Sequence, residues 1–152
     1  MNQISYRWIC KSFENLSPAE LYAILQLRNA VFVVEQNCPY QDEDDKDQKS
    51  YHLMGWVGDD LVAYTRLLPK DISYDKPSIG RVVTSPKYRR SGFGKELMIQ
   101  SLETAHKLWG KQPIQIGAQL YLQKFYESLG FIVCGPVYLE DGIDHIEMLH
   151  TP

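Results

Sequence analysis

The chain has 152 residues, of which 44% are hydrophobic and 23% are charged, and its formal net charge is −3. This composition is typical of a globular domain that is long enough to bury a sizeable core. The negative charge argues against nucleic acid as a partner, and the longest apolar run, residues 30–34, is far too short to span a bilayer.

The first predicted elements are a strand and an amphipathic helix. Residues 5–13 are rich in aromatic and β-branched side chains and predict a strand. Ser17 and Glu20 have the spacing of a capping box, and Pro18 stands at the first helical position. Apolar residues then recur at helical spacing, with Arg28 among them, so we expect a helix over residues 18–34.

The rest of the chain alternates strands with two further helices. Residues 51–58 and 61–68 predict a hairpin whose turn lies at Asp59 and Asp60, with Gly58 helping. Further strands are expected at 78–85, 113–119, 131–139 and 143–150, and helices at 94–109 and 120–130. This order predicts an α/β protein with a mixed sheet and helices on both faces. No linker divides residues 1–152, so we expect a single domain.

Glycines and basic residues gather before the helix that begins near Gly94. The first amides of a helix have no partner within it, and the helix dipole adds positive charge there, so such a site attracts anions. Gly92 and Gly94 allow close approach of a ligand to the backbone, while Arg89, Arg90 and Lys95 add donors. The spacing fits neither GxxxxGK[ST] nor GxGxxG. A phosphate site and a plain glycine turn are the two interpretations of these residues alone.

The pattern Arg89-x-x-Gly92-x-Gly94 resembles the pyrophosphate loop of the GNAT superfamily of N-acetyltransferases, which bind acetyl-CoA. The preceding "VVTSP" and the later "FYESLGF" are similar to other core motifs of that family. The segments "LRNAVFVVEQNCPYQ", "GWVGDDLVAYTRLL", "IGRVV" and "DGIDHIEM" resemble the ElaA subfamily. The resemblance covers nearly the whole chain and implies the GNAT fold, with acetyl-CoA as the acetyl donor and no metal.

The resemblance also assigns residues to the donor. The strand before the loop would pair with the pantetheine arm, as an added strand pairs with a sheet edge. Gln119 stands where many members carry an asparagine that contacts the cofactor. Tyr126 matches the family tyrosine near the thioester sulfur, where an acid can protonate or stabilise the leaving thiolate. The donor-binding residues implied are Val82, Val83, Thr84, Arg89, Arg90, Ser91, Gly92, Phe93, Gly94, Lys95, Gln119 and Tyr126.

The acceptor amine must lose a proton before it attacks the acetyl group, so a base is useful. Some family members carry a glutamate on the strand before the loop, whereas this chain has Gly80 and Arg81 there. Glu35 and His145 are the candidate bases, with Glu147 on the same strand face as His145. Arg81 is a candidate to grip a substrate carboxylate. Each of these residues also has a plain structural interpretation.

The acidic segment, with Asp42, Glu43, Asp44, Asp45 and Asp47, lacks the glycine and the final glutamate of an EF-hand loop. We expect a solvated loop there; an alternative is that it attracts a cationic amine, since it follows the helix that borders the acceptor side in this family.

Cys10, Cys38 and Cys134 are scattered and lack a CxxC pair, and no signal segment opens the sequence, so we expect reduced thiols in a cytoplasmic protein. The expected reaction is direct attack by the amine in a ternary complex, and the alternative is a non-catalytic acyl-CoA-binding module. The acceptor remains open among small polyamines, amino acids, aminoglycosides and protein lysines. Monomer and homodimer are both compatible with the sequence.

Overall fold

The computed structural model describes residues 6–152, apart from Arg90 and Ser91. The main chain forms the predicted order of strands and main helices, with differences in their limits, in the winding after Arg28 and in short added 3₁₀ turns. The strands are β1 (Arg7–Ser12), β2 (Tyr51–Val57), β3 (Asp60–Leu68), β4 (Ser78–Thr84), β5 (Ile114–Gln119), β6 (Phe131–Glu140) and β7 (Ile143–His150). The helices are α1 (Pro18–Arg28), η2 (Asn29–Glu35), α2 (Phe93–Trp109) and α3 (Gln123–Glu127), with 3₁₀ turns η1 (Phe13–Asn15), η3 (Asp47–Lys49), η4 (Pro86–Ser91) and η5 (Leu120–Leu122).

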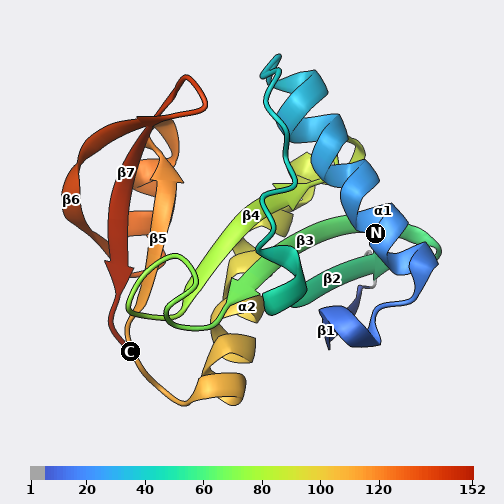
Figure 1. Ribbon diagram of the computed structural model, residues 1–152, viewed down its shortest axis with the longest axis horizontal. Coiled ribbons are helices and arrows are strands. Elements are labelled where there is room, and N and C mark those ends of the chain that lie inside the picture. Colours follow the sequence, from blue (N-terminus) through green and yellow to red (C-terminus); the bar gives the residue numbers. More distant parts are fainter. Residues whose placement is uncertain (1–5) are drawn as a thin grey trace.

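The seven strands form one mixed sheet in the order β1-β2-β3-β4-β5-β7-β6. All neighbouring pairs are antiparallel except β4 and β5, which run parallel and are paired only at Ser78 and Gln115. Beyond that point the two strands diverge, so the sheet opens as a wedge (Figure 1). The wedge leaves backbone donors and acceptors of β4 and β5 without a strand partner.

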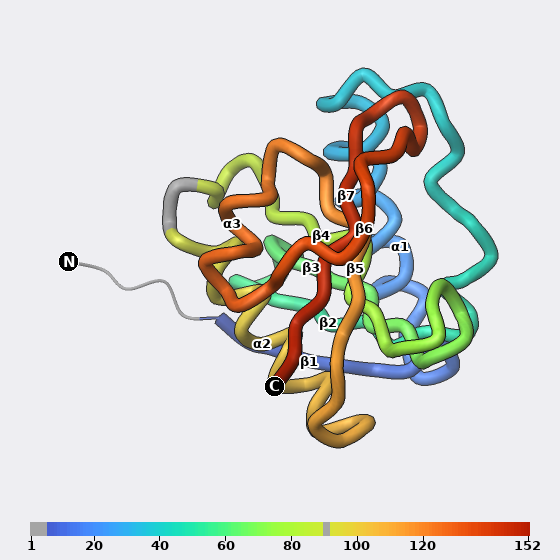
Figure 2. The backbone as a smooth tube through the Cα atoms, turned by 90° about the vertical axis from the view of Figure 1, so that its left-hand side faces the viewer, coloured from blue at the N-terminus to red at the C-terminus, as the bar shows by residue number. Residues whose placement is uncertain are grey.

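Helices cover both faces of the sheet, as predicted (Figure 2). On one face α1 packs Ile24 and Leu27 against Met54, Tyr64 and Val83. On the other face α2 and α3 cover a larger core that includes residues from both halves of the sheet, among them Leu67, Ile79, Met98, Ile114, Ile116, Tyr126 and Met148. The sheet is therefore buried on both sides near the wedge.

The first helix begins and ends for different local reasons. The Ser17 hydroxyl accepts from the Glu20 amide at 3.0 Å, and the Glu20 carboxylate accepts from the Ser17 amide at 2.8 Å, which confirms the capping box. After Arg28 the chain continues as a π-helix, and the i→i+5 bond from the Gln36 amide to the Val31 carbonyl measures 3.0 Å. The predicted helix over residues 18–34 is confirmed in extent, and its second part is π-wound, which apolar spacing does not reveal.

The hairpin turn between β2 and β3 lies one residue earlier than predicted. Its two central residues are Gly58 and Asp59, and Asp60 already belongs to β3. Gly58 has φ +59°, a conformation that glycine adopts without steric cost.

Candidate functional site

A cleft of about 820 Å³ lies in the wedge between β4 and β5. It brings together most of the predicted site residues, although they come from seven different elements. Those that line it are Glu35, Arg81, Val82, Val83, Thr84, Arg89, Gly94, Gln119, Tyr126 and His145. The grouping follows from the single pairing of β4 with β5, because a fully paired sheet would leave no room between these strands.

Arg89 and Gly94 line the cleft where η4 leads into α2, and Gly92, between them in the chain, is exposed and does not line it. Gly92 is the residue before α2 and has φ +76° and ψ 16°, a left-handed conformation. A side chain at this position would meet no atom within 4 Å, so the space in front of the turn is open. At Gly94 a Cβ would lie 3.7 Å from Phe125. The turn therefore presents the first amides of a 17-residue helix to open space, which is the geometry of an anion site.

The other predicted residues of the turn fall into three groups. Phe93 is 4% exposed, packs against Tyr6 and Tyr88, and does not line the cleft. Lys95 is exposed in the first turn of α2 and does not line the cleft itself. Arg90 and Ser91 lie outside the described residues.

Arg89 reaches across the cleft mouth to the end of η2. Its Nη1 donates to Glu35 Oε2 at 2.6 Å and its Nη2 donates to Glu35 Oε1 at 2.5 Å, which makes a two-pronged ion pair. The hydrogen bonds from Arg89 hold the pKa of the Glu35 carboxyl below its usual range. A carboxylate with a lowered pKa is a weaker base, and this one is already neutralised by its partner.

Tyr126 lies deep in the cleft on α3. It is 5% exposed and its ring packs edge-on against Phe125 and Phe131, with ring centroids 5.2 and 5.7 Å away. Burial, with a smaller contribution from Tyr121, raises the pKa of its phenol. The hydroxyl therefore keeps its proton at neutral pH and can donate a hydrogen bond to a developing negative charge.

A β-bulge interrupts β4 beside the wedge. Tyr64 pairs with Val83 and Arg66 pairs with Gly80, so Arg81 and Val82 together face the single residue Thr65. Arg81 has φ +48°, which is uncommon for a residue with a side chain. The bulge bends β4 at the point where β4 and β5 separate.

The Arg81 side chain lies against the acidic segment and is already paired with it. Its Nε is 2.9 Å from Asp42 Oδ1, and its Nη2 donates to the Asp42 carbonyl at 2.8 Å. The same nitrogen lies 3.3 Å from Asp44 Oδ2. A substrate carboxylate would have to displace these partners, so the predicted role of Arg81 toward substrate stays a prediction.

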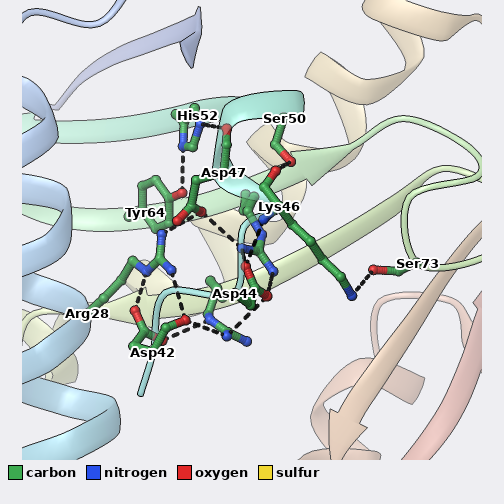
Figure 3. A network of polar contacts seen from close by, with 11 residues as sticks. Arg28, Asp42, Asp44, Lys46, Asp47, Ser50, His52, Tyr64 and Ser73 are labelled. Atoms are coloured by element: carbon green, nitrogen blue, oxygen red, sulfur yellow. Dashed lines mark hydrogen bonds and ion pairs between the residues drawn. The ribbon is translucent and has the colours of Figure 1, made fainter.

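The prediction of a solvated loop was wrong for Asp42, Asp44 and Asp47, which are paired with arginines, whereas Glu43 and Asp45 are exposed. Asp42 and Asp47 are 7% and 6% exposed, and both contact the fully buried Arg28, at 2.6 and 2.8 Å (Figure 3). Asp44 and Asp47 also hold the buried Arg66, at 2.7 and 2.9 Å. Three arginines thus meet three aspartates, so the cluster has no surplus negative charge with which to attract an amine.

His52 and Tyr64 extend this buried cluster. His52 Nε2 lies 2.9 Å from the Asp47 carbonyl, which can only accept, so Nε2 carries the proton. His52 Nδ1 then accepts from the Tyr64 hydroxyl at 2.7 Å. Burial lowers the pKa of His52, which keeps this arrangement neutral. His52 is therefore a buried, hydrogen-bonded structural residue.

His145 lies on β7 and lines the opposite side of the cleft from η2. It is 8% exposed, and its Nδ1 lies 2.7 Å from the Ile143 carbonyl. Because a carbonyl only accepts, Nδ1 donates in this contact and carries a proton. Glu140 Oε2 is 3.6 Å from the Nε2 of the same ring. Glu147, two residues further on β7, packs against Gly135 and does not line the cleft.

Two kinds of feature are absent from the described part of the chain. None of its helices is both long and apolar enough to cross a membrane. Within the same residues, no group of three or more His, Cys, Asp or Glu side chains could hold a metal ion.

Comparison with known proteins places this site in a family. The family profile described as acetyltransferase (GNAT) domain matches residues 17–151. Protein ElaA of Escherichia coli is 49% identical over 143 residues, which cover 93% of this chain and 94% of ElaA. The crystal structure of E. coli ElaA superposes with a TM-score of 0.89 over 96% of this chain and 99% of that one.

Two other solved structures extend the comparison. An acyl-CoA N-acyltransferase from Pseudomonas aeruginosa is 45% identical and superposes with a TM-score of 0.92, covering 97% of this chain and all of that one. A Bacillus subtilis acetyltransferase solved in complex with CoA shares the fold at 20% identity, with a TM-score of 0.64 over 97% of this chain and 99% of that one. The predicted mixed sheet with helices on both faces is thereby confirmed as the fold of these proteins. The chain belongs to the GNAT family of acyl-CoA-dependent acyltransferases, and within that family to the relatives of ElaA.

Proposed function

We propose that the chain is a single-domain N-acetyltransferase that transfers the acetyl group of acetyl-CoA to a primary amine by direct attack. The observation that carries this proposal is the wedge between β4 and β5, which has the Gly92 turn at its mouth and Tyr126 along its wall. The three cysteines support a route without an acetyl-enzyme: Cys10 has its thiol pKa raised to about 11 by burial, and neither Cys10 nor Cys134 lines the cleft. Cys38 lines the cleft but donates its thiol proton to the Asp141 carbonyl.

Several described residues support acetyl-CoA as the donor. The backbone of Val82, Val83 and Thr84 lies at the open edge of the wedge, where the amides of a pantetheine arm could pair with it. The pyrophosphate would take the amides of the turn from Gly92 to Lys95, together with Arg89. Gln119 lines the same cleft from β5. Arg90 and Ser91 keep their predicted place in this loop.

Tyr126 would serve the leaving group. When an amine attacks the thioester, the carbon–sulfur bond breaks and the electron pair goes to sulfur. A buried phenol that keeps its proton can donate a hydrogen bond to this thiolate as the charge develops.

His145 is the better placed of the two candidate bases. His145 lines the cleft, and because its Nδ1 donates to the Ile143 carbonyl, Nε2 is the nitrogen of the neutral ring that can accept a proton. Glu35, in contrast, is held by Arg89 with its pKa lowered. We therefore assign proton removal from the attacking amine to His145, directly or through a water molecule.

Replacing His145 by Asn should lower kcat/KM for the amine by about 100-fold or more, because general-base catalysis typically contributes at least that much. The limb of the pH–rate profile that reports the base should also disappear. His106→Asn changes a histidine on α2 whose ring faces His150 outside the cleft, so it serves as the matched control. A His145→Asn profile that retains the wild-type limb would contradict this assignment.

The proposed reaction is tested by release of free thiol from acetyl-CoA across a panel of polyamines, amino acids, aminoglycosides and lysine peptides. We expect thiol release and a matching acetylated amine with at least one class. CoA binding without thiol release from any of them would instead indicate a non-catalytic acyl-CoA-binding module.

A further inference from the structure

Two adjacent residues, Glu35 at the end of η2 and Gln36 directly after it, contact side chains that acetyl-CoA would need. Glu35 holds both terminal nitrogens of Arg89, at 2.6 and 2.5 Å. Gln36 accepts from Gln119 Nε2 at 3.4 Å. The contacts join segments 54 and 83 residues apart in the sequence, and all four residues line the cleft. The end of η2 therefore lies over the donor half of the site.

The guanidinium of Arg89 cannot bind Glu35 and the pyrophosphate of acetyl-CoA with the same nitrogen atoms. A guanidinium offers a planar fork that matches one carboxylate or one phosphate through two parallel hydrogen bonds. The Glu35 carboxylate already fills that fork. Its side chain is 41% exposed and that of Arg89 is 38% exposed, so solvent screens the pair and weakens it. A pyrophosphate that also gains the helix amides is the stronger ligand for this fork.

We propose that the pyrophosphate of acetyl-CoA displaces Glu35 from Arg89, and that the released carboxylate then binds the ammonium form of the acceptor amine. This inference rests on the proposed function. Glu35 is suited to that second role because the three aspartates of the neighbouring cluster are already neutralised by Arg28, Arg66 and Arg81. Once Arg89 turns to the phosphates, Glu35 gains an uncompensated negative charge in the cleft. Donor binding thus creates the charge that attracts the acceptor.

The exchange requires little movement of the main chain. Beyond Glu35, the Cys38 thiol donates to the Asp141 carbonyl at 3.2 Å, which ties this segment to the turn between β6 and β7. The Cys38 amide also donates to the Val33 carbonyl at 3.0 Å, within the π-helical turns. With the backbone fixed on both sides, rotation of the Glu35 side chain is sufficient to release Arg89.

The test is calorimetric titration of CoA into wild-type protein and variants at low ionic strength. Glu35→Gln should bind CoA more tightly than wild type, by about 2- to 5-fold, because an exposed ion pair no longer competes for Arg89. Arg89→Ala should weaken CoA binding, and adding Glu35→Gln to Arg89→Ala should bring no further gain. Glu43→Gln removes the same charge from an exposed residue outside the cleft and is expected to leave the affinity unchanged.

The second measurement is the KM for the acceptor amine. With an amine identified by thiol release, Glu35→Gln should raise the KM for the amine by about 5-fold or more, as expected for loss of a charged partner, while the affinity for CoA rises. A higher KM for the amine together with a tighter affinity for CoA would not result from general damage to the fold. Wild-type CoA binding with no gain in Glu35→Gln would overturn the exchange and leave the proposed function standing, whereas failure of wild type to bind CoA would overturn both.

Discussion

Gly92→Asp should abolish CoA binding, with a loss of affinity of about 100-fold or more. The substitution puts a side chain and a negative charge into the open space before α2, where the pyrophosphate is proposed to bind. Two lost charge-assisted hydrogen bonds of about 1.5–3 kcal/mol each would already account for that factor. Calorimetric titration with CoA measures it directly.

The control for this variant is Gly58→Asp. Gly58 also has a positive φ, +59°, and a side chain there would also meet no atom within 4 Å, but it lies in the turn between β2 and β3. Both variants therefore carry similar backbone strain and the same new charge. If Gly92→Asp binds CoA as well as Gly58→Asp does, the pyrophosphate does not use this turn.

Tyr126→Phe should lower kcat by about 100-fold, within the range found for a positioned acid, while the Kd for CoA changes by less than about 2-fold. The ring contacts with Phe125 and Phe131 do not need the hydroxyl, so the fold should be kept. The substitution removes the phenolic hydroxyl, whose raised pKa keeps its proton available to the departing thiolate. Steady-state kinetics with acetyl-CoA, combined with titration of CoA, separates the two effects.

Tyr51→Phe provides the comparison, because it removes a tyrosine hydroxyl from a ring that packs against Trp109 outside the cleft. It should leave kcat close to the wild-type value. An unaltered kcat in Tyr126→Phe would remove the proposed role of Tyr126 as an acid.

Local patterns in the sequence predicted the elements well because each depends on nearby residues. The capping box at Ser17 and Glu20 and the apolar face of α2 are set within a few positions of the chain, and both have the predicted form. The π-winding after Arg28 and the bulge at Arg81 were not predicted. Both are backbone adjustments that depend on packing against other elements and not on the type of residue.

For the site, the donor side was more predictable than the acceptor side. The Gly92 turn is a short contiguous motif, and the resemblance to a known family supplied the strand before it and Tyr126 after it. The ion cluster joins Arg28 on α1, Arg66 on β3 and aspartates of a loop, which only the fold brings together. One signal was available, since Arg28 lies on the apolar face of its helix and must find a buried anion there.

The wedge between β4 and β5 also divides the chain into two units for folding. Residues 7–84 supply β1 to β4, and residues 114–150 supply β5 to β7, so every other strand pair lies within one unit. Contacts local to each unit can form early and quickly, since closing short loops costs less entropy than closing long ones. The two units then meet chiefly through the core under α2, where Leu67 and Ile79 pack with Ile114 and Met148. Changes that widen or narrow the wedge can therefore accumulate without disturbing the strand pairs of either unit.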